Sequence, residues 1–152
     1  MCLALCFAMG GKSFSQSSPL FPEGAYWYTQ LRLSQGERKL AVSGLIDTGC
    51  SFCVVDSTFA VDSCRLSGAA LTTSYTRAAN GDRVKVHTCV LDRVDFCGTT
   101  FLGVKCLVVD LKGKFFAYAP NFIVGENLLS AQPLCFDLRN RRLSVGEREG
   151  EP

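Results

Sequence analysis

The 152-residue sequence lacks the patterns of several common protein classes. It contains one histidine, His87, and no Gly-x-Ser-x-Gly, P-loop or dinucleotide-binding motif, so the usual signatures of serine hydrolases and nucleotide-binding enzymes are absent. No apolar run approaches the roughly 20 residues of a membrane-spanning helix. The 16 basic and 14 acidic residues are scattered and give a formal net charge of +2, so no basic stripe indicates a nucleic-acid partner.

Long amphipathic helical patterns are also missing. Hydrophobic residues make up 47% and charged residues 20% of the chain, which is typical of a folded globular domain. Short apolar runs separated by polar turns indicate strands. We therefore predict one all-β domain over residues 25–146, with one short C-terminal helix around residues 127–132, and a frayed tail over residues 147–152.

The first 24 residues show no strand or helix periodicity. Residues 2–9 are apolar and are followed by a serine-rich stretch, but no basic residue precedes them. We predict that residues 1–24 are a flexible N-terminal segment or the remnant of a secretory signal. The nine cysteines are an odd number and cannot all pair within one chain, which favours the reducing cytoplasm; export is the alternative if residues 1–18 are a signal remnant.

Two hairpins stand out among the strand-like runs. The first pairs residues 26–33 with residues 40–46 around a polar turn. The second pairs residues 75–79 with residues 84–91, and its turn contains Asn80-Gly81, a strong hairpin signal. Further short strands are predicted at residues 94–96, 101–109, 122–124, 134–138 and 143–145.

Asp47 is the strongest candidate for chemistry. It follows the apolar run ending at Ile46, precedes Thr48-Gly49, and is soon followed by a second apolar run, residues 52–55. A polar loop is thus predicted between two buried strands. An aspartate that begins a turn, with Gly49 supplying flexibility, is the simpler interpretation of these three residues alone.

Three motifs in order make the chain resemble the retropepsin-like aspartic proteases. Residues 45–51, Leu-Ile-Asp-Thr-Gly-Cys-Ser, are similar to the segment that carries the catalytic aspartate in that family. The hairpin around residues 79–81 stands where the family has its flap, which closes over the substrate. Residues 122–129, Phe-Ile-Val-Gly-Glu-Asn-Leu-Leu, are similar to the segment beneath the catalytic loop.

The resemblance implies a closed acid-protease β-barrel and an aspartic endopeptidase that works as a homodimer. Peptide hydrolysis in this class uses two aspartates that share one proton. None of the other seven aspartates of the chain is followed by Thr-Gly or Ser-Gly. A second copy of Asp47, related by a two-fold axis, would therefore complete the dyad.

The resemblance also assigns residues to roles. The catalytic loop would be Asp47, Thr48 and Gly49, substrate would be bound by Ser51, Asn80 and Gly81, and the structural floor would be Ile123, Val124, Gly125 and Asn127. It implies peptide or protein substrates and neither cofactor nor metal. Cys50 stands where the family usually has Ala or Ser, and Ser51 where retroviral members carry an aspartate.

Two other interpretations stay open at this point. A dimeric peptide-binding or scaffold module could keep the fold and the Asp-Thr-Gly loop without catalysis, since fold does not determine function. A zinc or thiol-redox site could instead be built on Cys50-x-x-Cys53, with further ligands from Cys64, His87 and Cys89. A histidine of no catalytic role on a strand face is the simplest interpretation of His87.

Overall fold

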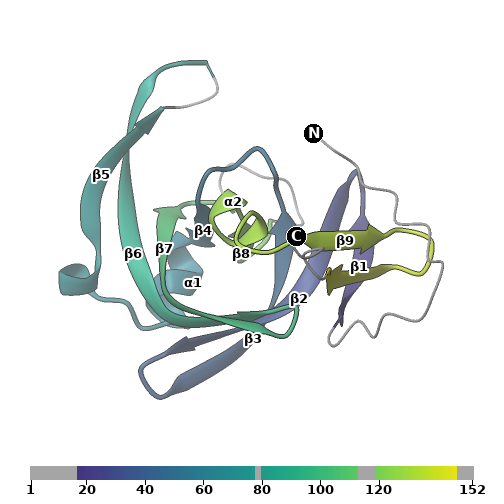
Figure 1. Cartoon of the computed structure of the whole chain (residues 1–152). Coiled ribbons are helices and arrows are strands. Elements are labelled where there is room, and N and C mark those ends of the chain that lie inside the picture. The colour runs from purple at the N-terminus through teal and green to yellow at the C-terminus, as the bar shows by residue number, and fades with distance from the viewer. Residues whose placement is uncertain (1–16, 78–79, 113–118, 147–152) are drawn as a thin grey trace, which may run out of the picture.

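A computed structural model describes residues 17–77, 80–112 and 119–146 (Figure 1). Strands dominate, joined by short turns and two short α-helices within these ranges. In chain order the elements are β1 (Ser17–Glu23), β2 (Tyr26–Gln35), β3 (Arg38–Ile46), β4 (Cys53–Asp56), α1 (Ser57–Asp62), a 3₁₀ turn (Gly68–Ala70), β5 (Thr72–Arg77), β6 (Arg83–Phe96), β7 (Thr99–Val109), β8 (Phe122–Val124), α2 (Glu126–Leu129), β9 (Leu134–Asp137) and β10 (Arg142–Val145).

The strands form one mixed sheet that closes on itself. Its order is β5-β6-β7-β4-β8-β3-β2-β1-β10-β9, and β6 also pairs with β2. This extra pairing closes a ring of β6, β7, β4, β8, β3 and β2, while β1, β10 and β9 extend away from it (Figure 1). The prediction of an all-β fold with a closed barrel is confirmed.

Apolar side chains are buried on both faces of the central strands. Inside the ring lies the main core, which includes the fully buried Phe122, Val55 and Leu91. Successive residues of a strand point to opposite faces, and accordingly Val54 and Ile123 belong to a second apolar cluster on the other face. That cluster, the outer apolar cluster, comprises Tyr28, Leu45, Val54, Leu111 and Ile123.

Both predicted hairpins are present. In the first, β2 pairs with β3 from Tyr28 opposite Leu45 to Gln35 opposite Arg38. In the second, β5 pairs with β6 from Thr72 opposite Thr88 to Arg77 opposite Arg83, and residues 80–82 belong to its turn. Residues 78–79 of this predicted hairpin lie outside the described residues.

The start of the folded part is where the sequence-based prediction is wrong. The sequence predicts a flexible segment over residues 1–24, whereas residues 17–23 form β1. This strand pairs with β2 on one side and β10 on the other, and Leu20 is buried between them. Pairing on two sides outweighs the weak local strand propensity of the segment. The remainder of the predicted N-terminal segment, residues 1–16, and the predicted tail, residues 147–152, lie outside the described residues.

The helices are short. α2 occupies Glu126–Leu129, close to the predicted helix at residues 127–132, and α1 is an additional helix that the sequence pattern did not predict. Within the described ranges, neither is long and apolar enough to cross a membrane.

Asp56 explains why α1 begins where it does. Its side chain is fully buried at the end of β4 and accepts hydrogen bonds from the backbone N–H of Phe59, at 3.1 Å, and of Leu111, also at 3.1 Å. The first contact caps α1. The second ties the segment after β7 to β4, and the Lys112 ammonium lies 3.6 Å from the carboxylate. One buried carboxylate therefore joins three elements.

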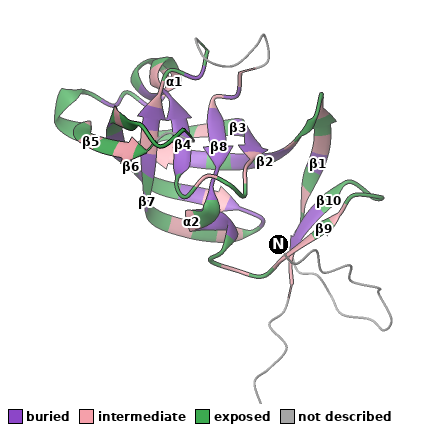
Figure 2. Ribbon diagram, turned by 90° about the horizontal axis from the view of Figure 1, so that it is seen from above, coloured by how far each residue is buried: buried purple, intermediate pink, exposed green. Residues whose placement is uncertain are grey.

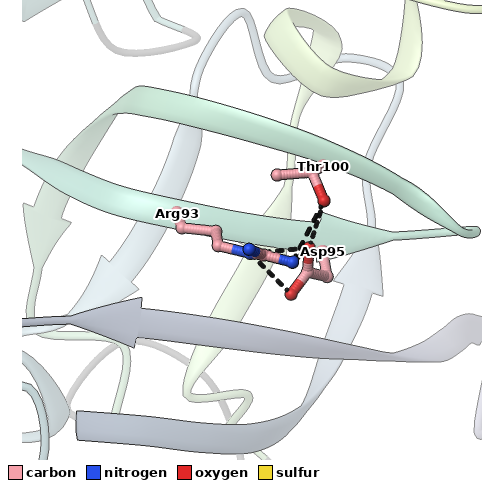
Figure 3. A network of polar contacts seen from close by, with 3 residues as sticks. All are labelled: Arg93, Asp95 and Thr100. Atoms are coloured by element: carbon pink, nitrogen blue, oxygen red, sulfur yellow. Dashed lines mark hydrogen bonds and ion pairs between the residues drawn. The ribbon is translucent and has the colours of Figure 1, made fainter. Parts of the chain in front are cut away.

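A polar network on the barrel surface fastens β6 to β7 (Figure 3). The Arg93 guanidinium donates to both carboxylate oxygens of Asp95, at 2.9 and 3.0 Å from Nε, and Thr100 donates to Asp95 at 2.6 Å. The hydrogen bonds from Arg93, followed by that from Thr100, hold the pKa of Asp95 below its usual value. Asp95 and Thr100 lie directly opposite each other on the two strands.

We predict that Asp56→Ala lowers the free energy of unfolding by about 2–4 kcal/mol, because it removes a helix cap and leaves the buried Leu111 N–H without an acceptor. Asp56→Asn keeps an oxygen acceptor and should cost less. Chemical denaturation would measure both, with Asp62→Ala, an exposed aspartate of α1, as the control. Equal losses for Asp56→Ala and Asp62→Ala would contradict the role given to the buried carboxylate.

We also predict a small pH-dependent contribution from Asp95. Because its pKa is lowered in the folded protein, the network stabilises the fold above the pKa of an unfolded aspartate, and this contribution is lost as pH falls through the folded pKa. Arg93→Gln should therefore narrow the difference between the stabilities measured at about pH 6 and about pH 2. Thermal unfolding across that range would test this, and an unchanged pH dependence in Arg93→Gln would count against it.

Candidate active site

Asp47 lies in the loop that connects β3 to β4 and passes over the end of β8. β8 runs between β3 and β4, parallel to β3 and antiparallel to β4. The chain leaves β3 at Ile46, passes the end of β8 and returns as β4 at Cys53. The loop of residues 47–52, here called the Asp47 loop, is thus held between the end of β3 and the strands β4 and β8, which are buried on both faces.

Hydrogen bonds fix the backbone of Asp47. Its N–H donates to the carbonyl of Val124 at 3.1 Å, and its carbonyl accepts from the N–H of Cys50 at 3.3 Å. Its carboxylate oxygen Oδ1 accepts from the N–H of Gly49 at 2.9 Å. Asp47 is half-buried, whereas Thr48 and Gly49 are exposed. The carboxylate is therefore anchored at its base and open towards the surface.

The segment after β8 lies beneath the loop in direct backbone contact. The N–H of Glu126 donates to the carbonyl of Cys50 at 2.7 Å. A Cβ atom at Gly125 would collide with the carbonyl group of Phe52 and lie 2.8 Å from the nitrogen of Cys53. Gly125 has φ of −98°, a conformation that any residue adopts, so the close approach of the two backbones is what requires glycine here.

The side chain of Asn127 fixes the C-terminal end of the Asp47 loop by hydrogen bonds. Its Oδ1 accepts from the N–H of Cys53 at 2.8 Å, and its Nδ2 donates to the carbonyl of Lys105 at 3.0 Å. One amide side chain on α2 therefore links the start of β4 to β7. An aspartate here could accept from Cys53 but could not donate to Lys105, so both ends of the amide are used.

The two cysteines of this region have separate environments. Cys50 is half-buried, packs against the outer apolar cluster, and its Sγ donates to the carbonyl of Phe52 at 3.0 Å. Burial raises the pKa of the Cys50 thiol, which lowers its thiolate fraction near neutral pH. Cys53 is fully buried, and its Sγ accepts from the N–H of Gly125 at 3.4 Å.

The cysteine-based alternatives gain no support from this arrangement. The seven cysteines in the described ranges are not joined in disulfides. Within the same ranges, no three His, Cys, Asp or Glu side chains are grouped so that they could hold a metal ion.

The tip of the second hairpin rises on the same side of the barrel as the Asp47 loop (Figure 1). The side chain of Asn80 is engaged within the turn: it donates to the carboxylate of Asp82 at 2.7 Å and accepts from the N–H of Asp82 at 3.1 Å. Gly81 has φ of +89°, and its carbonyl accepts from Arg77 at 3.2 Å. The turn is thus shaped by its own hydrogen bonds.

The structure brings most of the predicted site residues together in the Asp47 loop and the segment beneath it. These are Asp47, Thr48, Gly49, Ser51, Val124, Gly125 and Asn127. Ile123 belongs to the outer apolar cluster, one residue away on the opposite face of β8. Asn80 and Gly81 lie apart, at the hairpin tip. The backbone groups of Phe52 and Lys105 also support the loop, but backbone contacts leave no signal in side-chain identity, so the sequence did not predict them.

Comparison with known proteins agrees with this geometry. A family model described as aspartyl protease matches residues 31–127. The chain is similar in structure to a retropepsin-like aspartic protease from Rickettsia conorii, with TM-score 0.59 and 16% identity over 84% of this chain and 87% of that chain. It is also similar to the retroviral protease-like domain of Ddi1 from Leishmania major, with TM-score 0.50 and 14% identity over 87% of this chain and 99% of that chain. No curated protein sequence matches the chain.

The structural likenesses, at such low identity, establish the fold. The family model covers well over half of the sequence and includes the Asp47 loop, β8 and the start of α2. The chain therefore belongs to the retropepsin-like aspartyl protease family.

Proposed function

We propose that the protein is an aspartic endopeptidase whose catalytic dyad is formed by Asp47 from each subunit of a homodimer. The observation that supports it most directly is the position of the Asp47 carboxylate. It is held by hydrogen bonds within the Asp47 loop and is open to the surface beside the exposed Thr48 and Gly49. Membership of the aspartyl protease family supports the same conclusion.

The dimer follows from the number of suitable carboxylates. All eight aspartates of the sequence are among the described residues, and Asp47 alone stands in an Asp-Thr-Gly motif. The aspartate next along the chain, Asp56, is buried and engaged in capping α1. A two-fold axis beside the Asp47 loop would bring the same patch of two subunits together and supply the second carboxylate.

The chemistry then uses one shared proton. Two carboxylates at hydrogen-bonding distance cannot both ionise, so the dyad holds a single proton. The unprotonated Asp47 takes a proton from a water molecule, which attacks the carbonyl carbon of the scissile peptide. The protonated Asp47 donates its proton to the carbonyl oxygen. Collapse of the tetrahedral intermediate returns that proton to the dyad. The Asp47 that took a proton from water donates it to the peptide nitrogen as the C–N bond breaks, so the amine leaves and the dyad again holds one proton.

The neighbouring residues would position this dyad. Thr48 would hydrogen-bond across the two-fold axis, and Gly49 orients the Asp47 carboxylate through its N–H. Ile123, Val124, Gly125 and Asn127 would serve as the floor that keeps the Asp47 loop rigid. Rigidity matters because a displacement of about 1 Å can lower catalysis about 100-fold.

Substrate would lie as an extended chain between the floor and the second hairpin. Ser51, exposed within the Asp47 loop, and the turn of Asn80 and Gly81 would contact its backbone. Because the Asn80 side chain is already engaged with Asp82, we expect the turn to act through backbone groups.

We predict that Asp47→Asn lowers peptide cleavage by about 10²–10⁴-fold or more, because the amide can serve neither as general base nor as general acid. The fold and the dimer should persist, since the amide oxygen of the variant can still accept from the N–H of Gly49. A peptide library assayed over a range of protein concentrations, with Asp62→Asn as control, would measure this. For the unaltered protein, cleavage should rise faster than linearly with concentration below the dissociation constant of the dimer.

Two results would count against the proposal. Undiminished cleavage by Asp47→Asn would show that Asp47 is not a catalytic residue. Absence of cleavage by a well-folded dimer of the unaltered protein would favour the other function that the fold permits, a peptide-binding or scaffold module without catalysis.

We further predict that Gly125→Ala strongly reduces cleavage, because the added methyl group would displace the Phe52 carbonyl and with it the Asp47 loop. Overpacking of this kind should also cost about 1–3 kcal/mol of stability. Gly68→Ala is the matched control, since a Cβ there meets no atom within 4 Å. Activity and unfolding measured on both variants would test this, and full activity in Gly125→Ala would contradict the close-contact argument.

A further inference from the structure

The outer face of the second hairpin carries a concentrated positive charge. Over residues 73–77 of β5 and 83–87 of β6, the odd-numbered residues are exposed, whereas the even-numbered Ser74, Thr76, Val84 and Val86 are partly or fully buried. Three of the exposed residues are cations at neutral pH: Arg77, Arg83 and Lys85. We call this the basic hairpin face, and Figure 2 shows the exposure of its strands.

A single acidic side chain in this part of the sequence offsets this charge only in part. Asp82 is the one carboxylate among residues 72–88, and it is hydrogen-bonded to Asn80 at the turn. None of the three cations forms an ion pair with another described residue. Arg77 and Arg83 lie directly opposite each other, an arrangement of like charges that destabilises an isolated strand pair. A partner with negative charge would remove this repulsion.

The two guanidinium groups are already held near β5. Arg83 lies over the ring of Tyr75, 4.0 Å from its centroid, and so reaches from β6 across to β5. Arg77, on β5 itself, is held by its hydrogen bond to the carbonyl of Gly81. Side chains that are fixed before binding lose less conformational entropy when a carboxylate arrives.

β5 also offers backbone groups. It is the end strand of the sheet and pairs only with β6 among the described residues. An edge strand presents a row of unpaired N–H and C=O groups that an extended peptide can pair with. Alternate side chains of such an added strand would stand on the same face as Tyr75 and Arg77, about 4.8 Å from β5.

We propose that the basic hairpin face and the free edge of β5 together bind an extended acidic segment of another polypeptide, which adds to the sheet as a strand. A polypeptide fits better than a nucleic acid, because an extended polypeptide matches the alternating N–H and C=O groups along the edge of β5 and because the basic face is short. None of its residues belongs to the Asp47 loop, so binding can be measured in a variant that lacks the Asp47 carboxylate.

The test is direct binding to the full chain carrying Asp47→Asn, which prevents digestion of the probe. The probe is a fluorescein-labelled peptide of about six Glu-Thr repeats, whose carboxylates all lie on one face of a strand. Fluorescence anisotropy should show binding at about 50 mM NaCl that weakens strongly at about 500 mM. The double variant Arg77→Gln/Arg83→Gln should bind roughly tenfold more weakly.

The matched control removes the same charge elsewhere. Arg38→Gln/Lys39→Gln changes two exposed cations at the start of β3 and should leave binding unchanged. A Gln-Thr peptide should bind at least about tenfold more weakly than the Glu-Thr peptide, because it lacks the carboxylates that would pair with the cations. Alternate N-methylation of the Glu-Thr peptide should also abolish binding, because it removes the amides that pair with β5. Circular dichroism would show that all variants are folded.

Four results would overturn the proposal. Equal loss of affinity in the two double variants would mean that net charge alone attracts the peptide. Undiminished binding of the N-methylated peptide would rule out strand addition. Absence of Glu-Thr peptide binding at low salt would show that the basic hairpin face does not bind an acidic polypeptide. Binding of an oligothymidine strand at least as tight as that of the Glu-Thr peptide would identify the partner as a nucleic acid instead.

Discussion

The backbone of Gly125 lies against the carbonyl group of Phe52, with no room for a side chain between them. This contact joins the end of β8 to the Asp47 loop, and the hydrogen bonds from Asp47 to Val124 and from Glu126 to Cys50 flank it. Because β8 is itself enclosed by β3 and β4, the loop cannot shift without disturbing three strands. The position of one carboxylate is thereby set by the packing of the barrel.

Burial on both faces gives the central strands their rigidity. Phe122 and Val124 point into the barrel, whereas Ile123 points to the outer apolar cluster, which also contacts Cys50 of the loop. A strand that is packed on both faces cannot shift without losing contacts on at least one of them. Thr48, Gly49 and Ser51 of the loop are exposed, and they are the part that a second subunit or a peptide would have to reach.

The barrel extends into two regions of different character. The second hairpin carries unbalanced positive charge and ends the sheet with a free edge. At the other end of the sheet, β1, β10 and β9 pair outside the closed ring. The ring itself holds the Asp47 loop.

The sequence by itself determined the all-β class, the two hairpins and the identity of the Asp47 loop, because alternation, the Asn-Gly turn and the Asp-Thr-Gly motif depend on neighbouring residues. It did not predict β1, whose pairing with β10 joins segments distant in the chain, nor α1, which begins at a buried carboxylate also bonded to Leu111. Only the tertiary structure decided that Gly125 must be glycine and that Asn127 bridges Cys53 and Lys105. These features arise from close approach and hydrogen bonding between segments far apart in sequence, and local residue patterns do not contain that information.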